Sequence, residues 1–150
     1  MGMSTLRWSP AHNPQPVRGV ALAIHGLNYD PTRMQPVVDC LTAAGYDCLT
    51  LSLHGHGENF LPLPGRDESA ARLCSFARVT FDLWRDEAAA AYAVARARAD
   101  ALCVPLLLTG YSLGGLMGCA LVATQPDVQA HRLLLFAPAL AVPLGPQPAP

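Results

Sequence analysis

Residues Thr109–Leu116, TGYSLGGL, set one serine among glycines at the end of an apolar run. The preceding VPLLLTG (104–110) is typical of a buried strand, and the following LGGLMGCALVATQ (113–125) is typical of a helix that ends before a proline. Two interpretations of this run compete. One is a membrane span whose glycines let another helix approach, and the other is a strand that turns sharply into a helix and presents Ser112 at the turn.

The membrane interpretation has real support. No charged residue lies between Asp100 and Asp127, a stretch long enough to cross a bilayer. Gly110, Gly114 and Gly118 also have the spacing of helices that pack closely in membranes. Against a span, a proline and several glycines interrupt any single helix, and the flanking segments alternate as in a soluble α/β protein. We therefore expect no membrane span.

The turn interpretation accounts for more residues. G-x-S-x-G between a strand and a helix is the pattern of a nucleophile elbow, a strained turn that lifts the serine hydroxyl above the sheet. Side chains two residues on either side of the serine would clash in so tight a turn, and Gly110 and Gly114 stand there. The Leu113 amide would begin the helix and point at an oxyanion formed during attack by Ser112. A tight turn with an incidental serine is the alternative.

The rest of the chain alternates between strand and helix patterns. The expected strands are 5–9, 17–26, 46–53, 104–110 and 132–140, and the expected helices are 32–44, roughly 80–102 and 113–125. A long loop with Pro62, Pro64 and Gly65 precedes the second helix. This order predicts an α/β fold with a mostly parallel sheet and helices on both faces. We expect residues 1–140 to form the domain and the proline-rich tail 141–150 not to pack.

Composition excludes several classes of protein. A net charge of -1 offers no electrostatic reason to bind nucleic acid or an anionic membrane surface. The five cysteines are odd in number and never spaced Cys-x-x-Cys, which argues against a disulfide framework or a structural zinc site and predicts a cytoplasmic protein. All ten basic residues are arginine, a bias typical of a GC-rich bacterial genome. The first ten residues have no apolar core, so we expect them not to be a signal peptide.

With AIHGLN (23–28) and GYSLGG (110–115), the chain resembles the α/β-hydrolases, most closely the bacterial esterase, monoacylglycerol-lipase-like and serine-aminopeptidase-like branch. The resemblance runs from about residue 17 to residue 140 and covers only the amino-terminal half of the family fold. It therefore implies a partial α/β-hydrolase fold whose later strands are absent. His25 and Gly26 match the family's HG turn, which implies that the Leu27 amide is the second oxyanion donor and that His25 holds the turn.

LSLHGHGEN (51–59) resembles the family's D-x-R-G-H-G-x-S. Its matching residues are Gly55, His56 and Gly57, and its departures are Ser52, His54 and Asn59, where the family has Asp, Arg and Ser. The close pair His54 and His56 suggests a metal site, but a third ligand is missing, so we expect no metal. The chain has no P-loop lysine and no G-x-G-x-x-G, so we expect no cofactor.

The partners of a catalytic serine are not evident. A serine hydroxyl needs a histidine to take its proton and a carboxylate to orient that histidine. After Ser112 the sequence offers only Asp127 and His131, both expected near the amino-terminal end of the sheet, which is the wrong end for the site. The resemblance implies that the acid and the histidine come from loops after later strands. We therefore assign neither residue to the triad and expect a solvated loop.

These observations predict a serine hydrolase that cleaves a small-molecule carboxylic ester, or less readily an amide, through an acyl-enzyme on Ser112. The complete protein would include a missing carboxy-terminal half or a complementing chain. The alternative is a non-catalytic, partner-binding fragment or pseudo-hydrolase.

Overall fold

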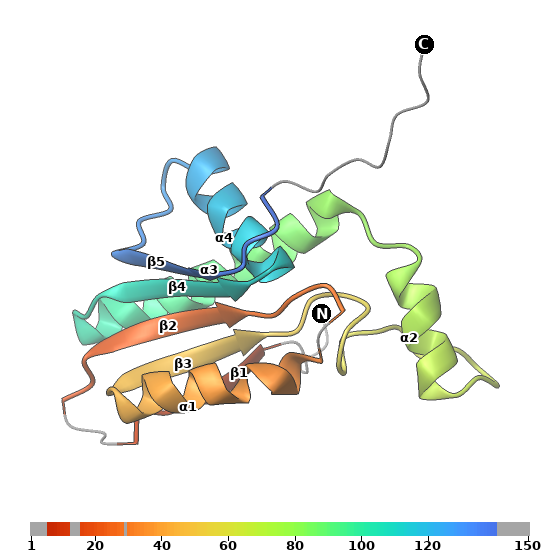
Figure 1. Ribbon diagram of the computed structural model, residues 1–150, viewed down its shortest axis with the longest axis horizontal. Helices are drawn as coiled ribbons and strands as arrows, with labels where there is room; N and C mark the ends of the chain where they lie inside the picture. The colour runs from red at the N-terminus through yellow and green to blue at the C-terminus, as the bar shows by residue number, and fades with distance from the viewer. Residues whose placement is uncertain (1–5, 13–15, 29, 141–150) are drawn as a thin grey trace, which may run out of the picture.

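The computed structural model describes residues 6–12, 16–28 and 30–140. Its strands are β1 (Leu6–Ser9), β2 (Gly19–Ile24), β3 (Tyr46–Leu51), β4 (Leu106–Tyr111) and β5 (Arg132–Phe136). Its helices are a short 3₁₀ turn η1 (Pro31–Met34), α1 (Gln35–Ala43), α2 (Glu68–Phe76), α3 (Phe81–Leu102) and α4 (Leu113–Thr124). Figure 1 shows the helices arranged around one sheet.

The five strands form a single sheet in the order β1-β3-β2-β4-β5. Strand β1 is antiparallel to β3, and all the other neighbours are parallel. All six residues of the central strand β2 are buried, as expected for a strand covered on both faces. The parallel strands therefore end together at the right-hand side of Figure 1, where the loops after β2, β3 and β4 meet.

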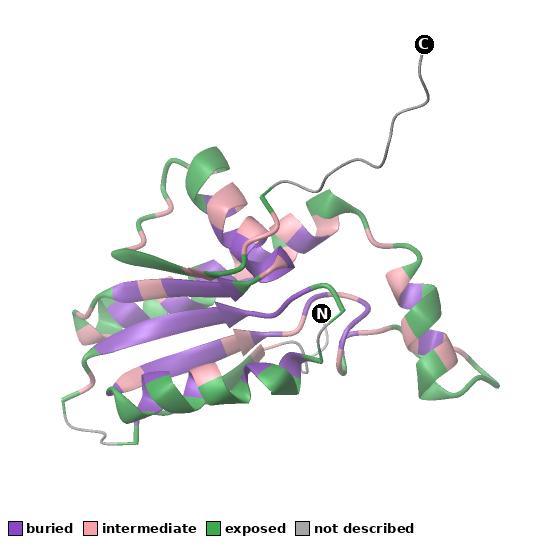
Figure 2. Ribbon diagram, in the orientation of Figure 1, coloured by how far each residue is buried: buried purple, intermediate pink, exposed green. Residues whose placement is uncertain are grey.

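Side chains alternate between two apolar layers because successive residues of a strand point to opposite faces. Val20, Leu22 and Ile24 pack with α3 and α4 on one face, whereas Ala21 and Ala23 pack with Met34 and α1 on the other. The buried layer runs through the middle of the molecule in Figure 2. The prediction of a mostly parallel sheet with helices on both faces is confirmed.

The predicted loop between β3 and α3 is wrong in one part, because it contains helix α2. Asp67 caps this helix by accepting a hydrogen bond from the Ala70 amide at 2.8 Å. Only Ala71 and Ser75 of the helix are buried, and Figure 1 shows it standing off the carboxyl ends of the strands. A short helix with so small a buried face leaves almost no apolar periodicity in the sequence. The expected tail 141–150 and Thr5 lie outside the described residues.

The uncharged stretch between Asp100 and Asp127, for which a membrane span was one interpretation, contains strand β4 and helix α4. Within the described ranges, no helix combines the length and the apolar character that crossing a membrane requires.

The turn between β4 and α4 packs directly against the end of β2. A Cβ atom at Gly114 would overlap the carbonyl oxygen of Ile24, and a Cβ atom at Gly110 would overlap the backbone of Gly114. A Cβ atom at Gly26 would lie 3.3 Å from the Ser112 Cβ atom and 2.8 Å from Tyr111. Three glycines therefore bring the two strand ends into backbone contact.

One part of the sheet has little cover. Tyr111, Leu134 and Phe136 share the face on which α1 packs against β2 and β3, because Tyr111 pairs with Phe136 and Thr109 pairs with Leu134. These three apolar side chains, which we call the β4–β5 face, are between 36% and 42% exposed. Strand β5 is also the edge of the sheet, and apolar edges and faces of this kind are places where other chain segments bind.

We expect Gly114→Ala to lower the free energy of unfolding by at least about 3 kcal/mol, because the new methyl group has no space against the Ile24 carbonyl. Urea denaturation measures the loss. Gly118→Ala in the same helix is the matched control, since its Cβ would meet only the end of the Leu133 side chain at 3.2 Å and alanine favours the helix. Equal stability of the two variants would contradict the close packing.

Candidate active site

Ser112 occupies a strained turn at the carboxyl end of β4. Its backbone angles are φ 50° and ψ -108°, in a region that residues other than glycine rarely adopt. Two segments hold it there. The Ser112 amide donates to the Phe136 carbonyl at 2.9 Å, and the Ala139 amide donates to the Ser112 carbonyl at 3.1 Å. The last residue of β5 and the segment that follows it thus fix the turn that the sequence predicted as an elbow.

Two backbone amides flank this serine. The Leu113 amide is the first of helix α4, where the helix dipole is positive and the amides have no partner inside the helix. The Leu27 amide follows Gly26, whose backbone lies against Ser112. Among the described residues, neither amide donates a backbone hydrogen bond.

His25 is buried and holds the loop that carries Leu27. Its Nδ1 donates to the Gly26 carbonyl at 2.8 Å, and its Nε2 accepts a hydrogen bond from the Leu53 amide at 3.0 Å. The Gly26 carbonyl and the Leu27 amide belong to one peptide group, so this bond fixes the direction in which that amide points. Burial lowers the pKa of His25 to about 4, which keeps the ring neutral with its proton on Nδ1.

His56 supports the same loop from the other side. Its Nε2 contacts the Leu27 carbonyl, its Nδ1 lies 3.3 Å from the His54 carbonyl, and its ring centroid is 4.7 Å from that of His25. The ring is buried against Phe76 and Trp84. Both ring nitrogens therefore face backbone oxygens of the chain, and the predicted motif residues His25 and His56 lie side by side.

Glu87 on α3 has a structural role that the sequence did not reveal. Its carboxylate accepts hydrogen bonds from the His54 amide at 2.7 Å and from the Asn59 side chain at 2.9 Å. Asn59 also donates to the Ser52 carbonyl at 2.8 Å. One hydrogen-bond network thus joins the three residues that differ from the family pattern, Ser52, His54 and Asn59, and holds the loop after β3. The signal in the sequence is a carboxylate three residues after buried Trp84, on the same helix face.

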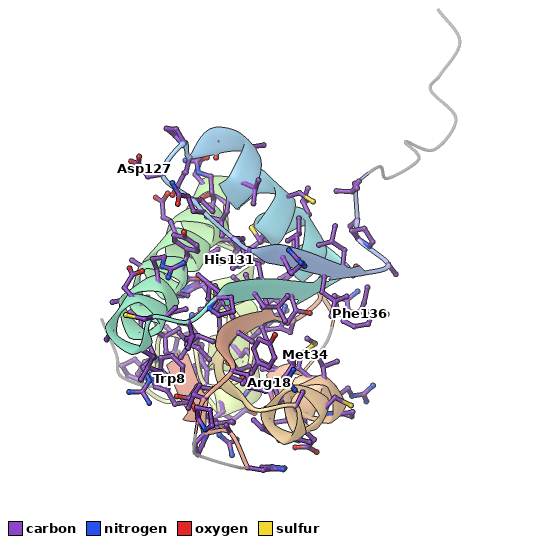
Figure 3. All side chains as sticks on the ribbon, turned by 90° about the vertical axis from the view of Figure 1, so that its left-hand side faces the viewer. Trp8, Arg18, Met34, Asp127, His131 and Phe136 are labelled. Carbon is purple, nitrogen blue, oxygen red and sulfur yellow. The ribbon has the colours of Figure 1, made fainter. Side chains whose placement is uncertain are left out.

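The structure does not bring a histidine to Ser112. No hydrogen bond among the described residues joins the Ser112 hydroxyl to a histidine ring. His131 accepts from the Leu106 amide at 3.1 Å, at the opposite end of β4. At about 3.3 Å per residue, the length of β4 alone separates His131 from Ser112 by about 16 Å. Figure 3, viewed from the amino ends of the strands, shows Asp127 and His131 on that side.

The described part of the chain contains no group of three histidine, cysteine, aspartate or glutamate side chains suited to a metal ion.

With this geometry in hand, comparison with known families is informative. The family model described as serine aminopeptidase, S33, matches residues 15–150. The chain belongs to this family of α/β-hydrolases. None of the curated proteins compared with the chain matches it.

Solved structures share the fold of this α/β-hydrolase chain. A soluble variant of monoglyceride lipase from Saccharomyces cerevisiae is 18% identical with a TM-score of 0.71, and the match covers 87% of this chain and 39% of the lipase. A carboxyl esterase from Bacillus coagulans is 14% identical with a TM-score of 0.68, covering 87% and 38%. The monoacylglycerol lipase of Paleococcus ferrophilus is 24% identical with a TM-score of 0.58, covering 91% and 44%. The chain thus spans about two fifths of their length.

The low pKa of His25 predicts an acid-dependent loss of stability. Between the unfolded value of 6.5 and the folded value of about 4, the unfolded chain binds a proton that the folded α/β-hydrolase chain does not. This contribution is therefore full above pH 6.5 and is lost as the pH falls toward 4, by about 3 kcal/mol.

Urea denaturation at several pH values, on the wild type and on His25→Asn, measures this effect. The asparagine variant does not titrate, so its stability deficit relative to the wild type should shrink by that amount as the pH falls. A deficit that is the same at neutral and acid pH would show that His25 is not held neutral.

Proposed function

We propose that this chain carries the nucleophile and the oxyanion-binding amides of a serine hydrolase that acts on a carboxylic ester or, less readily, an amide. Ser112 attacks the acyl carbon and forms an acyl-enzyme, which water then hydrolyses. The Leu27 and Leu113 amides bind the oxygen that becomes negative in the transition state. The observation that carries the proposal is the strained Ser112 turn, followed directly by the first amide of helix α4 and packed near Gly26, which precedes Leu27.

The family membership supports a hydrolase, and the lipases and esterases among the similar structures support an ester as substrate. Pre-oriented amides increase the rate of such a reaction strongly, since the loss of one oxyanion donor typically lowers the rate about 100-fold or more. The neutral, hydrogen-bonded His25 keeps the Gly26–Leu27 peptide in place without adding a charge that the transition state would have to accommodate.

The proposal requires a histidine and an acid from outside the described residues. We propose that a carboxy-terminal half or a complementing chain brings them to Ser112. Two features near the Ser112 turn support this view: Leu134 and Phe136 of the β4–β5 face are 42% and 39% exposed, and β5 is an edge of the sheet that the described residues form. A non-catalytic binding role for this same face is the second candidate, and the reactivity of Ser112 distinguishes the two.

We expect imidazole to replace the missing base. The 150-residue chain alone should react slowly with a fluorophosphonate, and added imidazole should accelerate the reaction at Ser112 at least about tenfold, because general-base catalysis is the element that is missing. Mass spectrometry of the modified peptide locates and quantifies the adduct over time.

Ser112→Ala and Ser9→Ala are the controls for this experiment. The first should abolish the imidazole-dependent adduct, and the second, at a serine of β1 on the opposite edge of the sheet from β5, should leave it unchanged. Rapid labelling without imidazole would show that the chain already contains its base. Labelling that imidazole does not accelerate would refute the role of Ser112.

A further inference from the structure

An open groove of about 340 Å³ adjoins the Leu27 loop. The loop after β2 forms one wall through Leu27 and Asn28, and helix α2 forms the other through Ser69, Arg72 and Phe76. This volume is enough for a small organic molecule. Leu27, which lines the groove, is next in the chain to Gly26, and a Cβ atom on Gly26 would lie 3.3 Å from the Ser112 Cβ atom. In Figure 1 it lies where α2 faces the carboxyl ends of the strands.

The described lining of the groove contains one arginine and several hydrogen-bond donors. The donors include Asn28, Ser69 and Arg72, and the described lining contains no carboxylate. The chain as a whole has a net charge of -1, so an attraction for anions has to come from local groups rather than from overall charge. Arg72 is the only cation that lines the groove among the described residues.

The Arg72 guanidinium is held in position and makes only a long, exposed ion pair. Its Nε donates to the Gly57 carbonyl at 2.8 Å, and its Cζ lies 5.1 Å from the centre of the Phe60 ring. One outer nitrogen lies 3.9 Å from the carboxylate of Glu68, whose side chain is 83% exposed. An exposed pair of this length contributes little free energy, so a ligand anion can compete with Glu68 for the outer nitrogens of Arg72. Asp30 lies within reach of the Arg72 charge but is already bonded to the Thr32 amide and hydroxyl.

We propose that the substrate is an ester carrying a second, anionic group, a carboxylate or a phosphate, which Arg72 binds in this groove while the ester lies at Ser112. The planar guanidinium fork matches the oxygens of either group. Asn28 and Ser69 supply further donors at the groove wall. This inference rests on the proposed function for its ester, but the anion site depends on the groove alone.

Binding of matched probes tests the site. The half-methyl esters of succinic, glutaric and adipic acids carry a carboxylate at three distances from the ester. The matched neutral probes keep the methyl ester and have a carboxamide, of nearly the same shape, in place of the carboxylate. Methyl esters with a phosphonate in place of the carboxylate form the phosphate arm. Titrations followed by NMR of the Arg72 Nε–H and of the Leu27 and Ser69 amides, at constant ionic strength, give the dissociation constants.

We expect at least one anionic ester to bind about tenfold more tightly than its amide, because the ion-assisted hydrogen bonds to Arg72 are lost in the amide. Tighter binding of the phosphonate identifies phosphate as the natural group, and tighter binding of the half-ester identifies carboxylate. Arg72→Gln should reduce the preference to less than about twofold. Arg78→Gln, at an exposed arginine outside the groove, should retain it.

Ser69→Glu provides a second route if Arg72→Gln disturbs the fold. This substitution leaves the contact between Arg72 and Gly57 intact, and a glutamate favours the first turn of α2. Because it places a carboxylate in the groove, it should remove the preference for the anionic ester over the neutral amide. Equal binding of anionic and neutral esters, no saturable binding of any anionic ester, or an equal loss in Arg78→Gln would overturn the proposal. Ser112→Ala should keep the preference for the anion, so failure of Ser112 to react and failure of this site give different results.

Discussion

The backbone contact between the end of β2 and the start of α4 is the constraint on which the site depends. Gly114 lies against the Ile24 carbonyl so closely that no side chain fits, and Gly110 lies equally close to Gly114. Only with this contact can the chain leave β4, reverse through a positive φ at Ser112 and begin a helix at once. The strain of that residue is balanced by hydrogen bonds from the segment after β5 and by burial of Leu113 and Met117 in the main core.

The same contact sets the electrostatics of the site. It brings Gly26 close to Ser112, and buried His25 orients the Gly26–Leu27 peptide through the Gly26 carbonyl. Because burial lowers the pKa of His25, the ring takes part as a neutral donor and acceptor, not as a cation. Under the proposed function, the described residues supply the amides for a developing oxyanion, and the base that the serine hydroxyl needs comes from outside them. Leu134 and Phe136 of the nearby β4–β5 face are 42% and 39% exposed.

The fold was largely predictable because its determinants are local. The apolar strands, the glycines around Ser112 and the helix ends at Gly45 and Thr80 are visible in short windows of sequence. Helix α2 was missed, since it buries only two residues. The buried Asp47, which accepts from the Ala11 amide and from Arg98, was also missed, because its partners are 36 and 51 residues away.

The candidate site was predictable to the same extent and for the same reason. Ser112, Leu27 and Leu113 stand in short motifs, and the structure brings these motifs together. Glu87 and Arg72 stand in no motif, and their contacts with Asn59 and Gly57 depend on how α2 and α3 pack against the loop after β3. Long-range contacts of this kind are decided by tertiary packing, which no short window of sequence contains.

A crystal structure of the chain with a phosphonate bound covalently to Ser112 would show whether the Leu27 and Leu113 amides bind an oxyanion. We expect the phosphonyl oxygen to lie about 3 Å from both amide nitrogens, with the backbone of the turn unchanged. A phosphonyl oxygen that points to solvent, or a turn that must rearrange to bind it, would show that these amides do not form the oxyanion site.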